Sequence, residues 1–477
     1  MIKRLFLLLL CVAVSAVPAS ARLPDLGDVA TSDLSPMAER RIGQSIMQDI
    51  RWRDPAYLGD PEIADYLNRL GGRLVAGSDQ PERDFEFFAI NDPTLNAFAM
   101  PGGFIGLHTG LILAAETESE LASVVAHEIA HVTQRHIAQL FGRQGQASMM
   151  VLASVLVAIL AARSNSQVSE AALAAGQAGA IQQQMGYTRA FEREADRIGL
   201  QILERSGFDV RGMPAFFERL QRSTRVYENN APGYLRTHPL TEERMADLGN
   251  RVAQMRYRQV PDSPDFGFVK TKIRTINGPA PDVVRDFESR VTAGNDSILN
   301  RYGLARALLR AGQVEEARRV ASGLREDAER SPFIDGLAAE VMFASREHGE
   351  AVNLLEKAVA AFPDYVALDY LYIEALLLSE QADEAARRAR QGALRNMGNA
   401  QYWMLSSRSE GALGRMSAYH RAQAEVHVLR GSLPAAIEQL EFARRAGDGD
   451  FHEMSAIDAR LRALKLEEEQ ERAQRRW

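Results

Sequence analysis

The chain has 477 residues, of which 46% are hydrophobic and 25% are charged, and its formal net charge is −7. This length is too great for one compact core, so two or three domains are expected. The composition is that of an ordinary globular protein, and the acidic balance argues against nucleic acid as the main partner.

Residues 1–21 have the pattern of a secretory signal peptide. Lys3 and Arg4 precede the apolar run LFLLLLCVAVSAV, and the small-x-small sequence ASA ends the segment. The apolar run is shorter than the ~20 residues that a membrane-spanning helix needs, which favours a signal peptide over a membrane anchor. Cleavage would also remove Cys11, the one cysteine of the chain. A mature chain without thiols suits an oxidising compartment.

Residues 22–45 are polar and are expected to form a loosely ordered entry segment. Residues 46–260 then mix helical patterns with short strand patterns. The sequence PEIADYLNRLGGRLV predicts an amphipathic helix, whereas FEFFAI and NAFAMPGGFIGLHTGLI predict strands around a Pro-Gly-Gly turn. Thr117 and Glu120 form a capping box, which predicts that the next helix begins there.

That helix carries an H-E-x-x-H pattern, His127, Glu128 and His131, inside the apolar run LASVVAHEIAHV. Two histidines four residues apart project from the same helix face. Neutral imidazole is a good zinc ligand, and two of them leave room for a third ligand and a water molecule. The carboxylate of Glu128 can take a proton from that water, so the pattern predicts a zinc site that hydrolyses peptide bonds. A five-residue pattern also occurs by chance, so a third ligand is needed.

The segment YTRAFEREADRIGL supplies a candidate for the third ligand. Glu192 and Asp196 are four residues apart in a helical pattern and therefore face the same way. Glu192 can complete a His₂Glu site, and Asp196 can accept a hydrogen bond from the distal nitrogen of a ligand histidine. Burying two histidines and a glutamate without a metal would be costly, which favours a metal site over a helix that merely contains these residues.

Residues 148–162, SMMVLASVLVAILAA, form a second apolar run. At about 15 residues this run is short for a membrane-spanning helix. The favoured interpretation is a buried helix or flap. The alternative is a surface that contacts a membrane or an apolar client, since exposed apolar patches commonly serve as contact sites.

Residues 261–295 are expected to form a linker or the first helix of a repeat domain. Residues 296–465 then repeat, and residues 466–477 form a charged tail. Equivalent alanines recur every 34 residues, at Ala317, Ala351 and Ala385. This is the period of tetratricopeptide helix pairs. Stacked pairs would bury a continuous core and leave a concave groove for protein segments, and they explain the spacing better than a generic helical bundle does.

The sequences VAHEIAHVTQRH, EREADRIG and NAFAMPGG resemble those of the gluzincin zinc peptidases related to the heat-shock membrane protease and the prenyl-protein protease. With the signal peptide and the repeats, the resemblance covers nearly the whole mature chain. It implies an α+β, gluzincin-like metallopeptidase domain, mostly helical with a small sheet, followed by an all-α tetratricopeptide-repeat solenoid. It also implies one Zn²⁺ per chain, with Glu128 as the general base and three ligands: His127, His131 and Glu192.

The resemblance assigns further residues around the cleft. An edge strand, to which an extended peptide can add as a further strand, would contain Asn96, Ala97, Phe98, Ala99 and Met100. An ordinary core strand is the plainer alternative. His238, in LRTHPLTEERM, matches a loop histidine that can bind the zinc as a fourth ligand and shut the enzyme off. It could instead shape the substrate site or stabilise the tetrahedral intermediate, or simply precede a helix.

The resemblance also implies a location and partners. The protein would be a periplasmic zinc endopeptidase that degrades misassembled outer-membrane proteins and assists β-barrel assembly. Its repeats would dock misfolded or stalled outer-membrane proteins and the outer-membrane β-barrel assembly machinery, with membrane contact through residues 148–162 left open. The alternative is chiefly a chaperone or scaffold with a self-inhibited peptidase. Repeat-bearing relatives use cysteines to tie the two domains together, whereas here docking must rest on packing and polar contacts.

Overall fold

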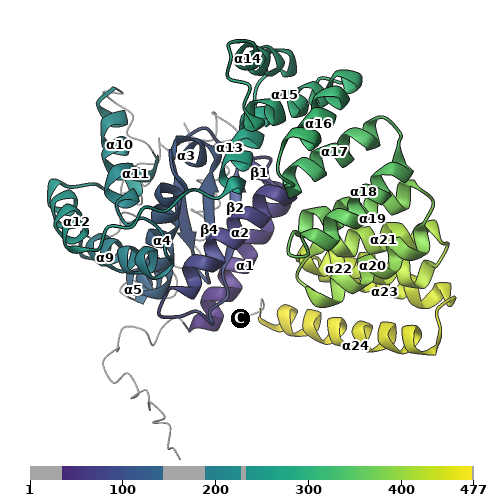
Figure 1. The fold of residues 1–477 in the computed structure, drawn as a ribbon. Helices are drawn as coiled ribbons and strands as arrows, with labels where there is room; N and C mark the ends of the chain where they lie inside the picture. Colours follow the sequence, from purple (N-terminus) through teal and green to yellow (C-terminus); the bar gives the residue numbers. More distant parts are fainter. Residues whose placement is uncertain (1–34, 143–188, 227–232, 475–477) are drawn as a thin grey trace, which may run out of the picture.

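A computed structural model of the chain describes residues 35–142, 189–226 and 233–474. The expected signal peptide and the apolar run 148–162 lie outside these ranges. In Figure 1 the N-terminal domain, coloured purple to teal, surrounds a small sheet, and the repeat domain, green to yellow, is a curved stack of paired helices. Within the described ranges, no helix is both long enough and apolar enough to cross a bilayer.

The sheet of the N-terminal domain has four strands in the order β1-β2-β4-β3. They are β1 (Tyr57–Leu58), β2 (Glu86–Ile90), β3 (Ala97–Met100) and β4 (Phe104–His108). Strands β2 and β4 are parallel, and the other two pairs are antiparallel. The predicted Pro-Gly-Gly turn joins β3 to β4, and it needs glycine because Gly102 and Gly103 have positive φ angles of 79° and 90°. The strand β3 lies at the edge of the sheet, as predicted.

The first helix, α1 (Pro36–Arg53), begins earlier than the sequence pattern suggested. Residues 36–45 of the expected entry segment are therefore helical. The side chain of Ser35 accepts a hydrogen bond from the backbone of Ala38 and caps the helix. Further along, α1 buries Ile46 and Ile50 in a cluster with β2 and β4. The polar composition of this segment concealed a helix that is held by one apolar face.

Besides α1 and the short helix before His238, the described part of the N-terminal domain contains seven helices. They are α2 (Pro61–Ala76), α3 (Thr109–Ala114), α4 (Glu118–Thr133), α5 (His136–Gly142), α9 (Arg189–Arg205), α10 (Gly212–Val226) and α12 (Glu242–Gln254). Every residue of α4 is buried, and this helix packs against α2, α9, α10 and β3. It begins at the predicted cap, where Thr117 accepts a hydrogen bond from the backbone of Glu120 at 3.2 Å. The core of the domain therefore holds the helix that carries the H-E-x-x-H pattern.

The helix pairs of the repeat domain begin earlier and end later than the repeat pattern alone indicates. The first four helices are α13 (Pro264–Ile276), α14 (Ala280–Thr292), α15 (Ile298–Arg310) and α16 (Val314–Asp327). The next four are α17 (Pro332–Ala344), α18 (His348–Ala361), α19 (Val366–Leu378) and α20 (Ala382–Arg395). The last four are α21 (Ala400–Ala412), α22 (Met416–Leu429), α23 (Leu433–Ala446) and α24 (Phe451–Gln474).

The structure decides between two alternatives in one segment and extends a helix into another. Residues 261–295, for which a linker was one alternative, contain the helices α13 and α14. The helix α24 also runs through most of the charged tail, to Gln474. The 34-residue spacing corresponds to stacked helix pairs, as predicted. The three equivalent alanines are fully buried where neighbouring helices meet: Ala317, Ala351 and Ala385.

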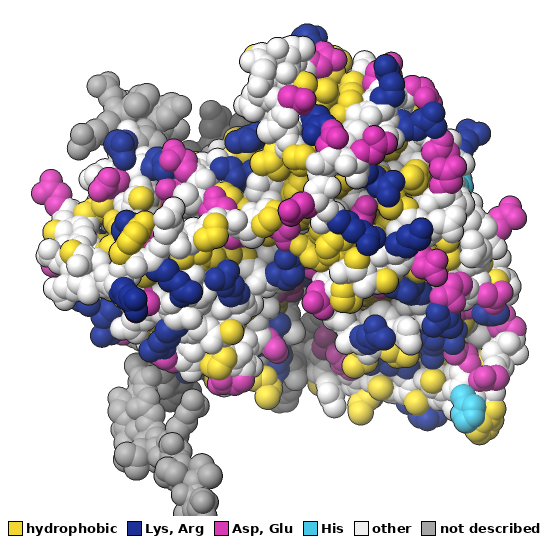
Figure 2. Space-filling model, viewed as in Figure 1, with side chains coloured by type: hydrophobic (Ala, Val, Ile, Leu, Met, Phe, Trp, Pro, Cys, Tyr) yellow, Lys and Arg dark blue, Asp and Glu magenta, His cyan; other side chains and the backbone are white. Residues whose placement is uncertain are grey.

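The repeat domain packs directly on the N-terminal domain, with α13 and α19 against α2. Arg69 of α2 forms an ion pair of 2.9 Å with Asp265, and its guanidinium lies 4.2 Å from the ring centroid of Tyr365. In a second contact, the guanidinium carbon of Arg430 lies 4.4 Å from the ring centroid of Trp52. The expected docking through packing and polar contacts is thus confirmed. Figure 2 shows Lys, Arg, Asp and Glu side chains interspersed over the visible face, without a large surface of one charge sign.

Candidate metal centre

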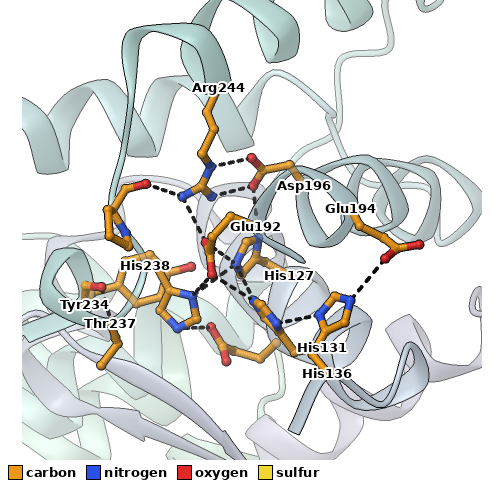
Figure 3. A network of polar contacts seen from close by, with 12 residues as sticks. His127, His131, His136, Glu192, Glu194, Asp196, Tyr234, Thr237, His238 and Arg244 are labelled. Atoms are coloured by element: carbon orange, nitrogen blue, oxygen red, sulfur yellow. Dashed lines mark hydrogen bonds and ion pairs between the residues drawn. The ribbon is translucent and has the colours of Figure 1, made fainter. Parts of the chain in front are cut away.

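The two histidines of the H-E-x-x-H pattern project from one face of α4 toward α9 (Figure 3). Their Nε2 atoms are 3.0 Å apart. The carboxylate of Glu192, on α9, lies 3.5 Å from each of these nitrogens. The two helices approach closely because a small residue faces the contact: a Cβ added at Gly199 would lie 3.2 Å from the backbone nitrogen of His127. The fold therefore brings together His127, His131 and Glu192, which are far apart in the sequence.

His238 adds a further imidazole to this cluster. It directly follows the short helix α11 (Gly233–Thr237), and its Nδ1 lies 3.1 Å from Glu192 Oε1 and 3.4 Å from His127 Nε2. Its ring stacks on that of Tyr234, with 4.6 Å between the centroids. All four candidate ligands are buried, and their ligand atoms lie within 4.8 Å of one another. The structure thus gathers four donor groups in a volume suited to one metal ion.

The donor set fits a divalent cation. Burial and the nearby ring of His127 lower the pKa of His131 well below its usual range, which leaves this imidazole neutral with a lone pair to donate. Although burial opposes ionisation, His238 and His127 hold the pKa of Glu192 well below its usual range. Burial also opposes charge on His127, yet Asp196 and Glu192 raise its pKa to about 9. The cluster therefore favours a positive charge at its centre, which a bound metal ion would supply.

Asp196 lies behind His127, one helical turn beyond Glu192. Its Oδ1 is 3.1 Å from His127 Nδ1, the contact predicted from the E-x-x-A-D spacing. Arg244, on α12, donates to both oxygens of Asp196 at 2.7 Å and pairs with Glu192 at 2.9 Å. The same guanidinium donates to the backbone oxygen of Pro239 at 2.7 Å. Arg244 therefore connects the His238 segment to both acidic residues of α9.

Glu128 is fully buried between His238 and the edge strand. Its Oε1 lies 3.5 Å from His238 Nε2, and α4 packs on β3. Burial raises the pKa of the Glu128 carboxyl, although His238 and His127 oppose this shift. A carboxylate with a raised pKa is suited to accept a proton near neutral pH. Asn96 lies just before the strand rather than in it, and its side chain packs near Gly233 at the start of α11.

Three further residues surround the centre, and two of them, Arg244 and Tyr234, have no sequence signal that predicts them. Arg244 is the first of these residues. The second is Tyr234, which is fully buried against His127 and His238. His136 is also buried, with its Nδ1 2.8 Å from His131 Nδ1 and its Nε2 3.3 Å from Glu194. A contact between the ring nitrogens of His131 and His136 fixes the orientation of the first ring. The spacing of five residues places His136 off the ligand face and leaves a supporting or a surface position open, and the end of α4 between the two histidines brings their rings into contact.

Comparison with known proteins agrees with this geometry. Residues 61–252 match the model of peptidase family M48, and residues 342–408 match a tetratricopeptide repeat model. The chain is 34% identical over 457 residues to the beta-barrel assembly-enhancing protease of Escherichia coli (strain K12), which covers 95% of this chain and 93% of that protein.

Two further relatives extend the comparison. A putative beta-barrel assembly-enhancing protease of Vibrio cholerae serotype O1 is 33% identical over 472 residues, covering 97% of each chain. The mitochondrial metalloendopeptidase OMA1 of Arabidopsis thaliana is 28% identical over 241 residues, covering 49% of this chain and 46% of that protein. This chain therefore belongs to peptidase family M48 and is a metalloendopeptidase with C-terminal tetratricopeptide repeats.

Proposed function

We propose that the protein is a zinc-dependent endopeptidase in which His127, His131 and Glu192 hold the metal and Glu128 is the general base. The observation that carries this proposal is the convergence of these buried side chains within a few ångströms, with Glu128 beside them. Two histidines and one carboxylate are a typical ligand set of catalytic zinc, which leaves a position for water. Bound zinc supplies Lewis acidity and makes that water more acidic.

The residues of the chain would then transfer the proton and position the substrate. Glu128 takes the proton of the attacking water, and the raised pKa of its carboxyl favours passing the proton on to the leaving amine. The edge strand β3 pairs only with β4 among the described strands, so its outer side is available to an extended peptide, which would add as a fifth strand. Asp196 Oδ1 lies 3.1 Å from His127 Nδ1, and this contact would fix the ring orientation.

His238 is proposed to hold the enzyme in a closed state. Its Nδ1 lies among the candidate ligand atoms, and its side chain is buried with them. As a fourth ligand it would occupy the position that the catalytic water needs. Opening requires the segment after α11 to leave, which breaks the stacking of His238 on Tyr234. The alternative role of His238 is to stabilise the tetrahedral intermediate. Replacing His238 with alanine distinguishes the two roles.

We further propose a periplasmic location and outer-membrane protein clients. The N-terminal signal pattern supports export, and the relatives named beta-barrel assembly-enhancing protease support clients from that assembly process. The repeats would dock stalled barrel precursors or the assembly machinery, since stacked helix pairs offer extended binding surfaces. The closed site favours a second candidate function, a chaperone or scaffold in which the peptidase is mostly silent.

The substitution Glu128→Gln tests the enzymatic proposal. The variant is expected to bind zinc with unchanged stoichiometry and to lose at least a thousandfold in the cleavage rate of an unfolded outer-membrane protein. The matched control is Glu204→Gln, an exposed glutamate on α9. Normal cleavage by Glu128→Gln would overturn the mechanism. Full rescue of a deletion strain by the same variant would instead favour the scaffold function.

A further inference from the structure

The two ring nitrogens of His131 face different groups (Figure 3). Its Nε2 points into the candidate metal centre, 3.0 Å from His127 Nε2 and 3.5 Å from Glu192. Its Nδ1 lies 2.8 Å from Nδ1 of His136, and both rings are fully buried. At this distance one of the two nitrogens must carry a proton and donate it, while the other accepts.

The direction of this hydrogen bond follows from the use of Nε2. To bind a metal through Nε2, His131 must keep the lone pair there, so its proton lies on Nδ1 and is donated to His136. His136 then carries its own proton on Nε2, which faces Glu194 Oε2 at 3.3 Å. Phe191 stacks on the ring of His136, with 4.4 Å between the centroids. One arrangement of protons therefore satisfies both neutral rings and the carboxylate.

A strained turn between α4 and α5 brings His136 to this position. The helix α4 ends at Thr133, and α5 begins at His136. Between them Arg135 has a φ angle of 55°, in the left-handed region that residues with a side chain rarely adopt. This turn places the ring of His136 back against His131. Such strain persists only where the surrounding structure holds it.

Glu39 of α1 holds this turn from outside. Its side chain is buried, and its Oε1 accepts hydrogen bonds from Arg135 Nε and Nη2 at 3.0 and 2.6 Å. Its Oε2 accepts one from Arg83 at 3.2 Å. Arg83 in turn donates to the backbone oxygen of Val132, in the last turn of α4, at 3.1 Å. Because charge-assisted hydrogen bonds are the stronger ones, Glu39 fixes both the turn and the end of α4.

We propose that His136 is a positioning residue for the metal ligand His131, and that Glu39 holds the turn that presents it. This inference rests on the proposed function, because it takes His131 as a ligand. By supplying an acceptor in a fixed direction, His136 keeps the Nε2 lone pair of His131 aimed at the ion. This support is separate from the contact of Asp196 with His127, so each ligand histidine has its own partner.

The test measures zinc affinity of the full mature chain by competition with a chromophoric chelator. Leucine and asparagine have nearly the same shape, but only asparagine has an acceptor close to the place of Nδ1. His136→Leu is therefore expected to weaken zinc binding roughly 10- to 100-fold, and His136→Asn should recover most of this loss. The melting temperature of the metal-free chain should be similar in the two variants. The control, His452→Leu at an exposed histidine of α24, should bind like the native chain.

A second pair of variants tests the turn. Glu39→Gln keeps the shape of the side chain but weakens its hold on Arg135. Zinc affinity is expected to fall roughly 3- to 10-fold, less than on loss of a direct partner of the ligand. Adding Arg135→Gly in the same chain should restore the affinity, because glycine adopts a positive φ angle without strain.

Native affinity in His136→Leu would overturn the positioning role, and so would equal losses in His136→Leu and His136→Asn. Native affinity in Glu39→Gln, or no recovery on adding Arg135→Gly, would refute the role of Glu39. A native chain that binds no zinc would contradict the proposed function itself. Zinc bound normally by the native chain and by His136→Leu would contradict only the positioning, so the two failures are distinguishable.

Discussion

The guanidinium of Arg244 donates two hydrogen bonds of 2.7 Å to Asp196, one to each carboxylate oxygen. Asp196 lies in turn 3.1 Å from His127 Nδ1. A residue of α12 thereby helps to fix the ring of a candidate ligand on α4, through a carboxylate on α9. Because Arg244 also donates to the backbone oxygen of Pro239, the position of the His238 segment is coupled to the position of that carboxylate.

The first prediction concerns Asp196. Asp196→Ala removes the acceptor beside His127 and leaves Arg244 with Glu192 as its remaining carboxylate partner. Zinc affinity is expected to fall roughly 10- to 100-fold, the usual effect of losing such a supporting residue. Competition with a chromophoric chelator measures the affinity. Asp247→Ala is the control, because this partly exposed residue of α12 pairs within its own helix with Arg251. A change below twofold would show that Asp196 does not orient the ligand.

The second prediction concerns His238. If its imidazole closes the site, His238→Ala should raise the cleavage rate of an unstructured peptide roughly tenfold, because a larger fraction of molecules is then competent. Zinc should remain bound with one ion per chain, since three ligands are left. His348→Ala, at a partly exposed histidine of α18, is the control. A rate that stays unchanged or falls would exclude self-inhibition and would favour a role in stabilising the tetrahedral intermediate.

Local patterns were sufficient to predict the main elements and to name the side chains that converge at the candidate metal centre. The helix of His127 and His131 has a cap, an apolar face and a four-residue ligand spacing, all within one short segment. Glu192 and Asp196 were found by the same helical spacing. Each of these features depends only on residues that are close together in the sequence, so it can be recognised without the structure.

Contacts between distant segments could not be predicted in this way. Arg244 lies in an ordinary polar helix, and only the packing of α12 against α9 buries it beside Asp196. Tyr234 has no pattern of its own and becomes part of the site because its backbone N–H bonds to Leu95 at 3.0 Å.

The third prediction concerns removal of the metal. Four buried ligand groups lose their common partner when a chelator strips the ion. A metal that binds only the folded state stabilises it by about 2.7 kcal/mol when its free concentration is 100 times Kd. The melting temperature should therefore fall on adding EDTA and recover with zinc. Glu128→Gln should keep this difference, and Glu192→Gln should lose most of it. An unchanged melting temperature in EDTA would contradict a structural contribution of the metal.

The fourth prediction concerns the charges buried between the two domains. Lys272 of α13 is 2% exposed, pairs with Asp60 at 2.7 Å and also contacts Glu62. Lys272→Met leaves both carboxylates buried without their ammonium group. Breaking a buried pair on one side costs roughly 3–5 kcal/mol. Chemical denaturation at pH 7 measures this loss. Lys465→Met, at an exposed pair with Glu441, should change the stability by about 0.5 kcal/mol or less.

The pH dependence of this difference follows from the signs of the two shifts. Although burial opposes it, Lys272 lowers the pKa of Asp60, so this contribution is present above the unfolded pKa of about 3.9 and is lost as the pH falls through the folded value. Burial likewise opposes charge on Lys272, yet Glu62 raises its pKa. That contribution is complete below the unfolded pKa of about 10.4 and is lost as the pH rises through the folded value. Burial also raises the pKa of Glu62 although Lys272 opposes this shift, so the difference between the native chain and Lys272→Met should be largest between about pH 7 and 9 and shrink at both extremes. A difference that changes steadily across neutral pH would show that another group controls the junction.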